Sequence, residues 1–286
     1  MQKWGLLEVS DGNTGVAVTY SSQQRREQIL AEVIEKGHVT AKDLATQIQV
    51  SEATVRRDMK VLADEGELEL VYGGATLPRS SDYSFRSKGQ RNVEAKRTIG
   101  RLAAELVGDD EQIFLDSGTT SFEMAPFLNR KRGLSVIVNS VRVSSELNSP
   151  NLNVILLGGQ YRPDRMDTVG TLALSALEQL RGYVAFIGCD GLSQDIGPTA
   201  VDIESATLYR VATRNARSTT LLADHTKFEA PSLFKIVEWD AVSRVVTDRQ
   251  PAPEWLAFFE QRRIEVFFPK EVLSVEPQAS RLKPQA

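Results

Sequence analysis

The sequence contains few of the residues that form covalent cross-links or metal centres. Its 286 residues include one cysteine, Cys189, and two histidines, His38 and His225. A single cysteine excludes an intrachain disulfide, which fits a reducing compartment, and we expect the protein to be cytoplasmic. Neither histidine has a second histidine or a cysteine at a spacing that would complete a metal site. We therefore expect neither a metal nor another cofactor.

Long apolar runs and a surplus of basic charge are also missing. No apolar stretch approaches the length that spans a bilayer. The first residues also lack the basic and apolar segments of a signal peptide, so we expect no membrane association. The chain has 34 basic and 38 acidic residues and a net charge of −4, so binding to a nucleic acid would need a local basic cluster. The length and the 41% hydrophobic content suit two domains with cores of their own.

The apolar residues recur at helical spacing from residue 23 onwards. A first helix is expected to end at Gly37, and Thr40 and Ser51 are the expected N-caps of two further helices, the third running from about residue 52 to 64. Apolar and polar residues then alternate from Leu68 to Tyr72, which predicts a small β-ribbon. Three helices, a tight turn before the third and a following ribbon predict a winged helix-turn-helix in residues 21–76.

The third predicted helix has one apolar stripe, formed by Val55, Met59 and Leu62. Its other side would face the major groove of DNA, where arginine can contact guanine through two hydrogen bonds. The candidate DNA-binding residues are Thr40, Ser51, Ala53, Thr54, Arg56, Arg57 and Lys60. A solvated, salt-bridged helix face is the alternative. Residues 23–79 carry a net charge of −2, so we expect weak non-specific binding and a homo-oligomer.

The rest of the chain divides into a linker, a larger domain and a tail. Residues 77–92 are rich in serine and predict the linker, and residues 1–20 and 271–286 receive no function. In residues 93–270 short apolar segments alternate with helical patterns. Strands are expected at 112–116, 134–138, 153–157, 184–188, 218–222, 243–247 and 264–267, and helices at 94–107, 120–129, 141–147, 170–181, 203–216, 233–238 and 254–261. This alternation predicts an α/β fold with a mostly parallel sheet covered on both faces.

Small and polar residues follow several of the predicted strands. The turn Asp116-Ser117-Gly118-Thr119-Thr120 could present backbone N–H groups and hydroxyls to an anion, or it could be a plain helix cap. Ligands of open α/β sheets bind outside the carboxyl ends of the strands, where these turns would converge. The candidate ligand-binding residues are Lys96, Asp116, Ser117, Gly118, Thr119, Thr120, Asn139, Gly158, Gly159, Gly188, Asp190, Gly191, Glu204 and Lys227.

Two stretches of the chain carry motifs in a characteristic order. The first runs from Val50 to Met59 and is followed by Gly66 and Gly73-Gly74-Ala75. The second comprises Asp116 to Thr120, Asn139-Ser140, Gly158-Gly159, Val169-Gly170, Phe186 to Gly188 with Asp190-Gly191, Glu204, and Asp224 with Lys227-Phe228. In these two stretches the chain resembles the DeoR family of bacterial sugar-metabolism regulators. The sequence departs from the family at four places: Leu70 and Tyr72 replace basic wing residues, Tyr183 or Val184 stands where the family has Asp, and Tyr209-Arg210 replaces a Lys-Arg pair.

The resemblance implies a transcriptional repressor of a carbohydrate-catabolic operon that binds duplex operator DNA and is released by a small phosphorylated sugar. It also implies a ligand-binding domain with the fold of sugar-phosphate isomerases and CoA transferases. Two alternatives stay open. One is an activator, which would use the same module. The other is a sugar-phosphate isomerase-like enzyme with a DNA module, in which Asp116, Asp190, Glu204 and Lys227 supply acid, base and electrostatic stabilisation.

Overall fold

The computed structural model describes residues 21–64, 67–76 and 85–269, which fall into two compact units, one within residues 1–83 and one within residues 84–286. The predicted leader 1–20, the tail 271–286 and most of the linker lie outside the described residues. None of the described helices is long and apolar enough to cross a membrane.

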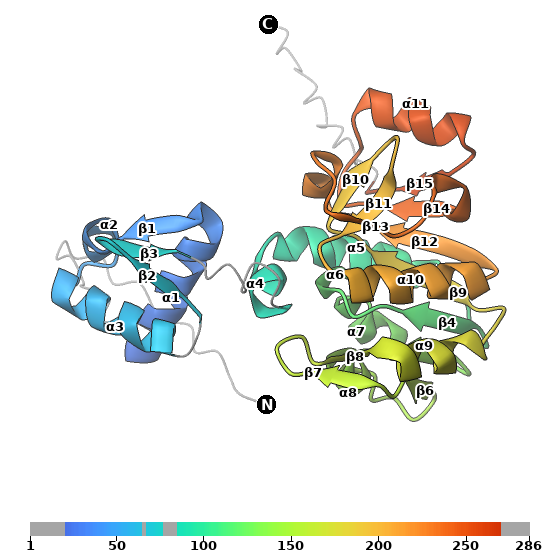
Figure 1. Cartoon of the computed structure of the whole chain (residues 1–286), viewed down its shortest axis with the longest axis horizontal. Helices are drawn as coiled ribbons and strands as arrows, with labels where there is room; N and C mark the ends of the chain where they lie inside the picture. The colour runs from blue at the N-terminus through green and yellow to red at the C-terminus, as the bar shows by residue number, and fades with distance from the viewer. Residues whose placement is uncertain (1–20, 65–66, 77–84, 270–286) are drawn as a thin grey trace, which may run out of the picture. The chain divides into compact units, whose positions relative to one another are not determined.

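The N-terminal unit has the three predicted helices and ribbon, with one more strand (Figure 1). Its elements are α1 (Ser22–Lys36), β1 (His38–Thr40), α2 (Ala41–Gln47), α3 (Glu52–Asp64), β2 (Glu69–Val71) and β3 (Gly74–Thr76). Gly37 ends α1 at φ 74°, a left-handed conformation that glycine adopts without a steric penalty. The unexpected strand β1 pairs antiparallel with β3, so the sheet order is β1-β3-β2.

One apolar cluster holds this unit together. It is made of one stripe from each helix and the inner residues of the small sheet, and its members include Ile29, Val33, Leu44, Val55, Met59, Leu62 and Ala75. Each helix is too short to be stable by itself in water, so this shared core supplies most of its stability. The packing fixes which side of α3 faces solvent.

The second unit is built on a seven-stranded sheet of order β15-β14-β12-β9-β4-β5-β6, in which every neighbouring pair is parallel. The strands are β4 (Gln112–Leu115), β5 (Ser135–Val138), β6 (Asn153–Leu156), β9 (Val184–Gly188), β12 (Ser218–Leu222), β14 (Arg244–Val246) and β15 (Glu265–Phe267). All seven predicted strands are present. The chain starts in the middle with β4, builds outwards to β6, returns to β9 beside β4 and builds outwards again. The switch point of the sheet therefore lies between β4 and β9.

Helices cover both faces of this sheet. They are α5 (Val93–Glu105), α6 (Thr119–Phe122), α7 (Ala125–Leu128), α8 (Val141–Glu146), α9 (Gly170–Glu178), α10 (Ile203–Asn215) and α11 (Pro253–Gln261). Alternate residues of β4 enter different cores: Ile113 and Leu115 pack with α5 and α7, whereas Phe114 packs with α9 and α10. This three-layer arrangement is the predicted α/β fold.

Several elements differ from the sequence expectations. The predicted helix 120–129 is two short helices, and Pro126 lies in the first turn of the second one. The predicted helix 233–238 is wrong, because Phe234–Lys235 forms strand β13 on β11 (Gly197–Ala200), which also pairs with β10 (Gly191–Ser193). Its six residues are too few for apolar spacing to separate helix from strand. The β7–β8 pair (Gln160–Arg162 and Asp167–Val169) was not predicted. Helix α4 (Phe85–Gln90) lies in the predicted linker.

Candidate functional site

The outward side of α3 carries the predicted DNA-binding cations. Val55, Met59 and Leu62 are buried, whereas the side chains of Arg56, Arg57 and Lys60 are exposed. Among the other candidates, Ala53 and Ser51 are exposed, and Thr54 and Thr40 are partly exposed. Arg56 lies 3.3 Å from the carboxylate of Glu52, which is one turn earlier in the helix and is exposed as well. A pair of this kind contributes about 0–1 kcal/mol, so a phosphate or base can displace it at small cost.

Ser51 and Thr40 cap their helices as predicted. The Ser51 hydroxyl accepts a hydrogen bond from the Thr54 backbone N–H at 3.2 Å, and the Thr40 hydroxyl accepts one from the Asp43 N–H at 3.1 Å. The Thr54 hydroxyl lies 2.9 Å from that of Ser51. These bonds fix the starts of α2 and α3. In a helix-turn-helix, the first residues of the second helix contact the bases.

A buried ion pair that the sequence analysis missed connects α3 to α1. The Asp58 carboxylate, which is 4% exposed as a residue, receives a 2.5 Å hydrogen bond from Arg25 Nε. The pair raises the pKa of Arg25 through the hydrogen bond with Asp58, against the opposing effect of burial. The signal was available, because Asp58 lies between Val55 and Met59 on the buried side of the helix. The pair fixes the rotation of α3 about its own axis.

The wing presents apolar side chains where the family resemblance led us to expect basic ones. Leu70 is half exposed and Tyr72, at the turn between β2 and β3, is fully exposed. Both side chains are accessible to solvent, but neither supplies a positive charge for a phosphate.

In the larger unit, Asp116 connects the two strands at the switch point. It follows β4 directly, and its Oδ2 accepts a hydrogen bond from the backbone N–H of Gly188, at the end of β9, at 2.7 Å. Its Oδ1 accepts one from the Gly118 N–H at 2.9 Å. Asp116 is fully buried, and this burial raises the pKa of its carboxyl group above the usual value. The residue therefore shapes the turn and holds β4 to β9.

Most polar groups of the turn after Asp116 already form hydrogen bonds within the protein. The Ser117 hydroxyl donates to Asp167 Oδ2 at 2.9 Å and lies 3.2 Å from the hydroxyl of Tyr209, which is also buried. Helix α6 has four residues, so its dipole is short, and the Gly118 N–H is already bonded to Asp116. Thr119 is partly exposed and Thr120 is buried. Of the predicted anion-binding donors in this turn, Thr119 is thus the most accessible.

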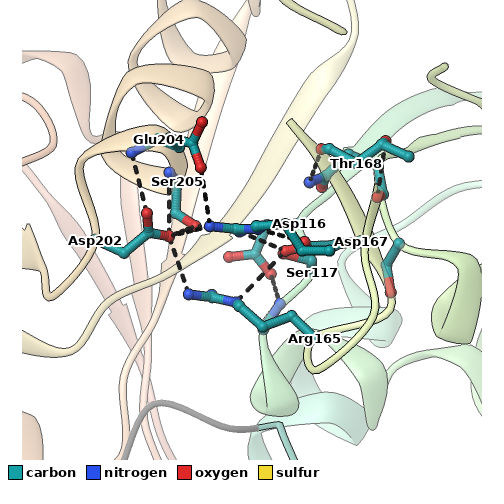
Figure 2. Close-up of polar contacts among 12 residues, drawn as sticks. Asp116, Ser117, Arg165, Asp167, Thr168, Asp202, Glu204 and Ser205 are labelled. Atoms are coloured by element: carbon teal, nitrogen blue, oxygen red, sulfur yellow. Dashed lines mark hydrogen bonds and ion pairs between the residues drawn. The ribbon is translucent and has the colours of Figure 1, made fainter. Parts of the chain in front are cut away.

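An arginine–carboxylate network at this edge was not predicted (Figure 2). Arg162 forms two 2.8 Å bonds with the fully buried carboxylate of Asp167, and its Nη1 lies 3.0 Å from Asp202 and 3.5 Å from Glu204. Arg165 reaches Asp202 at 2.9 Å. The network connects the β7–β8 hairpin with the start of α10, and it includes the predicted residue Glu204, which is exposed.

Electrostatics within the network favour the charged forms of Asp202 and Arg162. Burial opposes ionisation of Asp202, but hydrogen bonds from Ser205 and Arg162 outweigh it and lower the pKa of the Asp202 carboxyl. The charged form of Arg162 is favoured in the same way. Burial acts against its charge, but the hydrogen bonds and charges of Asp167 and Asp202 outweigh burial and raise the pKa of Arg162.

Two lysines at the same edge involve helix α4: Lys88 is part of this helix, and Lys96 binds its C-terminal end. Lys88 lies on α4, and its Nζ is 2.5 Å from Oδ1 of Asp190, the second residue after β9. The buried Lys96 donates to the backbone carbonyl oxygens of Lys88 and Arg91, the latter at 2.6 Å, so it satisfies carbonyl groups at the end of α4. Burial lowers the pKa of Lys96 to about 8.

Lys227 lies on the short 3₁₀ helix His225–Phe228 that follows β12. Its Nζ is 3.9 Å from Asp224 Oδ2. Asp224 is 1% exposed, and its Oδ2 has no hydrogen-bond partner among the described residues. The ring of Phe228 packs edge-on against Trp255 of α11 at a centroid distance of 5.2 Å, which fixes this segment.

The remaining candidates lie at the ends of β5, β6 and β9. Asn139 is buried and donates to the Thr168 carbonyl oxygen at 3.0 Å, which connects β5 to β8. Gly158 is exposed and has open space at its Cβ position, whereas a Cβ on Gly159 would lie 2.6 Å from the Val169 carbonyl oxygen. Gly191 is buried in β10 against Ala230. Among the described residues, no three His, Cys, Asp or Glu side chains are grouped so that they could hold a metal ion.

Six residues at this edge of the sheet were not predicted from the sequence. They are Lys88, Arg162, Arg165, Asp167, Asp202 and Tyr209. Lys88 lies in the predicted linker, and the two arginines lie in a hairpin whose polar sequence resembles a loop. Their positions follow from pairings between distant parts of the chain, such as Arg162 with Asp202, which no local pattern contains.

Comparison with known proteins agrees with this two-part organisation. Residues 25–81 match the family profile described as "DeoR-like helix-turn-helix domain", and residues 91–249 match "DeoR C terminal sensor domain". The lactose phosphotransferase system repressor of Lactococcus lactis is 31% identical over 84% of this chain and 96% of that protein. The glycerol-3-phosphate regulon repressor of Escherichia coli is 28% identical over 80% and 91% of the two chains.

A ribose 5-phosphate isomerase from Methanocaldococcus jannaschii is among the solved structures that align with part of the chain. It is 16% identical, covers 48% of this chain and 55% of its own, and has a TM-score of 0.36. A likeness at this level says nothing about the activity of this chain.

Proposed function

Because this chain belongs to the DeoR family of transcriptional regulators, we propose that it represses a carbohydrate-catabolic operon and that a phosphorylated sugar releases it from its operator. The observation that carries the proposal is the pair of family matches, one on each structural unit. The two relatives described above are named as repressors, one of a lactose phosphotransferase system and one of a glycerol 3-phosphate regulon.

In this proposal α3 enters the major groove. Its exposed cations Arg56, Arg57 and Lys60 contact bases and phosphates, while the Asp58–Arg25 pair and the buried stripe hold the helix in place. The net charge of −2 over residues 23–79 limits non-specific attraction, so we propose that two or more copies act together on a repeated site.

The effector binds at the carboxyl ends of β4, β9 and β12. Lysines supply charge for the phosphate, and carboxylates such as Asp190 and Glu204 accept hydrogen bonds from sugar hydroxyls. The effector lowers occupancy of the operator only to the extent that it binds the DNA-free form more tightly. An isomerase role is not supported, because Asp116 is fully buried and both its oxygens accept backbone N–H groups.

The DNA half of the proposal is tested with the double variant Arg56→Ala/Arg57→Ala. Genomic fragments selected by the wild-type protein serve as DNA, and affinity is measured by fluorescence anisotropy at several salt concentrations. The control Arg101→Gln/Arg214→Gln removes two exposed charges from the other unit. Each lost contact with DNA costs about 1–3 kcal/mol, so we expect the α3 variant, which loses two, to bind at least about 30-fold more weakly. The control should lose little affinity. Unchanged binding by the α3 variant would exclude this use of α3.

A further inference from the structure

Helix α4 is the described element that comes next after the DNA-binding unit in the chain, and it packs on the candidate effector site. Its Phe85 ring lies edge-on to Phe122 of α6, with centroids 5.5 Å apart, and 4.3 Å from the Arg142 guanidinium carbon. A Cβ built on Gly89 would be 3.8 Å from the methyl group of Thr119. Helix α4 therefore lies against the turn that follows β4.

Polar contacts between this segment and the strand ends are equally direct. Lys88 pairs with Asp190 after β9, and Asn92 donates to Asp224 Oδ1 after β12 at 3.4 Å. The other Asp190 oxygen accepts the Val201 N–H at 2.9 Å. The side chains of Lys88 and Asp190 keep 24% and 21% of their surface exposed, so both can be reached from solvent.

Other cations lie near Lys88. Burial lowers the pKa of Lys88, the charge and hydrogen bond of Asp190 oppose this lowering, and the charges of Arg165 and Lys227 add to it. Lys96 is repelled by Lys227 and Lys88 in the same way. An anion placed among these cations would relieve their mutual repulsion.

We propose that Lys88 of helix α4 binds the acidic group of the effector, so that occupancy of the site changes how α4 is held. This inference rests on the proposed function. A sugar phosphate can replace both halves of the Lys88–Asp190 pair, because its phosphate accepts from the ammonium group and its hydroxyls donate to the carboxylate. Neither of these partly buried charges is then left without a partner, which would be unfavourable.

The exchange would connect the ligand with the DNA-binding unit through the chain itself. Helix α4 is joined to β3 by residues 77–84, and its other end is bound by Lys96. Free sugar offers no anion to Lys88. Inorganic phosphate can donate through its own P–OH group, but it lacks sugar hydroxyls that reach Asp190 while the phosphate stays on Lys88. A phosphorylated sugar is the ligand that satisfies both groups.

The test compares the full-length wild-type protein with Lys88→Gln, Lys88→Arg and Lys88→Gln/Asp190→Asn, with Arg101→Gln as the control for loss of a surface charge. Ribose 5-phosphate, fructose 6-phosphate and glycerol 3-phosphate are titrated by calorimetry. The best of the three is compared with its unphosphorylated form and with inorganic phosphate. Thermal unfolding without ligand shows whether each variant is folded. The double variant keeps the test valid if Lys88→Gln alone is unstable, because it leaves no unpaired carboxylate.

For the wild-type protein we expect the phosphorylated form to bind more tightly than either the free sugar or phosphate. Lys88→Gln and the double variant should lose about 10- to 100-fold in affinity for the sugar phosphate, since a charge-assisted hydrogen bond is lost, and Lys88→Gln should lose much less for the free sugar. Lys88→Arg should recover most of the loss. Equal affinities of folded Lys88→Gln and wild type for the sugar phosphate would overturn the inference. If no phosphorylated ligand binds the wild type at all, the proposed function fails instead.

Discussion

Replacement of Arg162 is expected to destabilise the larger unit more than replacement of any exposed arginine. Arg162 is 15% exposed in its side chain and forms two hydrogen bonds with Asp167, which has no exposed surface. Removal of one partner of a buried pair costs about 3–5 kcal/mol, because the other charge stays buried without compensation. Arg165 Nε remains 3.5 Å from Asp167 Oδ2 and Ser117 still donates to it, so we expect the lower end for Arg162→Gln, about 3 kcal/mol.

The measurement is thermal and urea unfolding of the full-length protein, monitored by the fluorescence of the buried tryptophans Trp239 and Trp255 of the larger unit. A loss of about 3 kcal/mol corresponds to a fall in its Tm of roughly 6–12 °C for a unit of this size. Arg162→Lys keeps the charge but loses the planar two-bond geometry, and we expect a loss of about 1–2 kcal/mol. The control is Arg214→Gln, whose exposed pair with Glu178 contributes about 0–1 kcal/mol. Equal, small effects of Arg162→Gln and Arg214→Gln would refute the assignment of Arg162 as the centre of a buried network.

Three further changes test other parts of the structure. The burial that lowers the pKa of Lys96 to about 8 means that the unfolded chain binds more protons than the folded one from about pH 8 to its unfolded pKa. Stability should therefore rise with pH across that window, and the rise should be smaller in Lys96→Met, as measured by urea unfolding at several pH values. Gly100→Ala should destabilise by about 1–3 kcal/mol despite the higher helix propensity of alanine, because its Cβ would lie 2.5 Å from the Glu123 carbonyl oxygen; a rise in Tm would contradict this packing. Asp58→Asn should lower the Tm of the DNA-binding unit and reduce operator affinity together, whereas intact affinity would show that the pair with Arg25 does not orient α3.

The sequence predicted the elements whose cause is local. Residues 113–115 of β4 are a run of apolar residues that is buried on both faces, and the helix 52–64 has a regular apolar stripe with a serine cap. Such patterns are properties of a single window of the chain, so they can be recognised without the fold. The helix–strand alternation was sufficient to predict a parallel sheet and the edge where ligands bind.

The contacts of the site could not be predicted in the same way. Lys96 was a candidate for ligand binding, but its position in space gives it the carbonyl groups at the end of α4 as partners. Asp116 was another candidate, and the return of the chain to β9 places the Gly188 N–H beside it. In both cases the partner is set by how distant segments meet. Polar hairpins such as Gln160–Val169 lack the apolar alternation that identifies strands, so the arginines they carry were missed.

The most direct measurement is a titration of the protein–operator complex with ribose 5-phosphate, fructose 6-phosphate and glycerol 3-phosphate. Fluorescence anisotropy of labelled operator DNA gives the fraction of DNA that is bound at each concentration. The account predicts that at least one of these compounds releases the DNA, while its unphosphorylated form at the same concentration does not. An operator affinity that is unchanged by all three compounds, or that only becomes tighter, would contradict it.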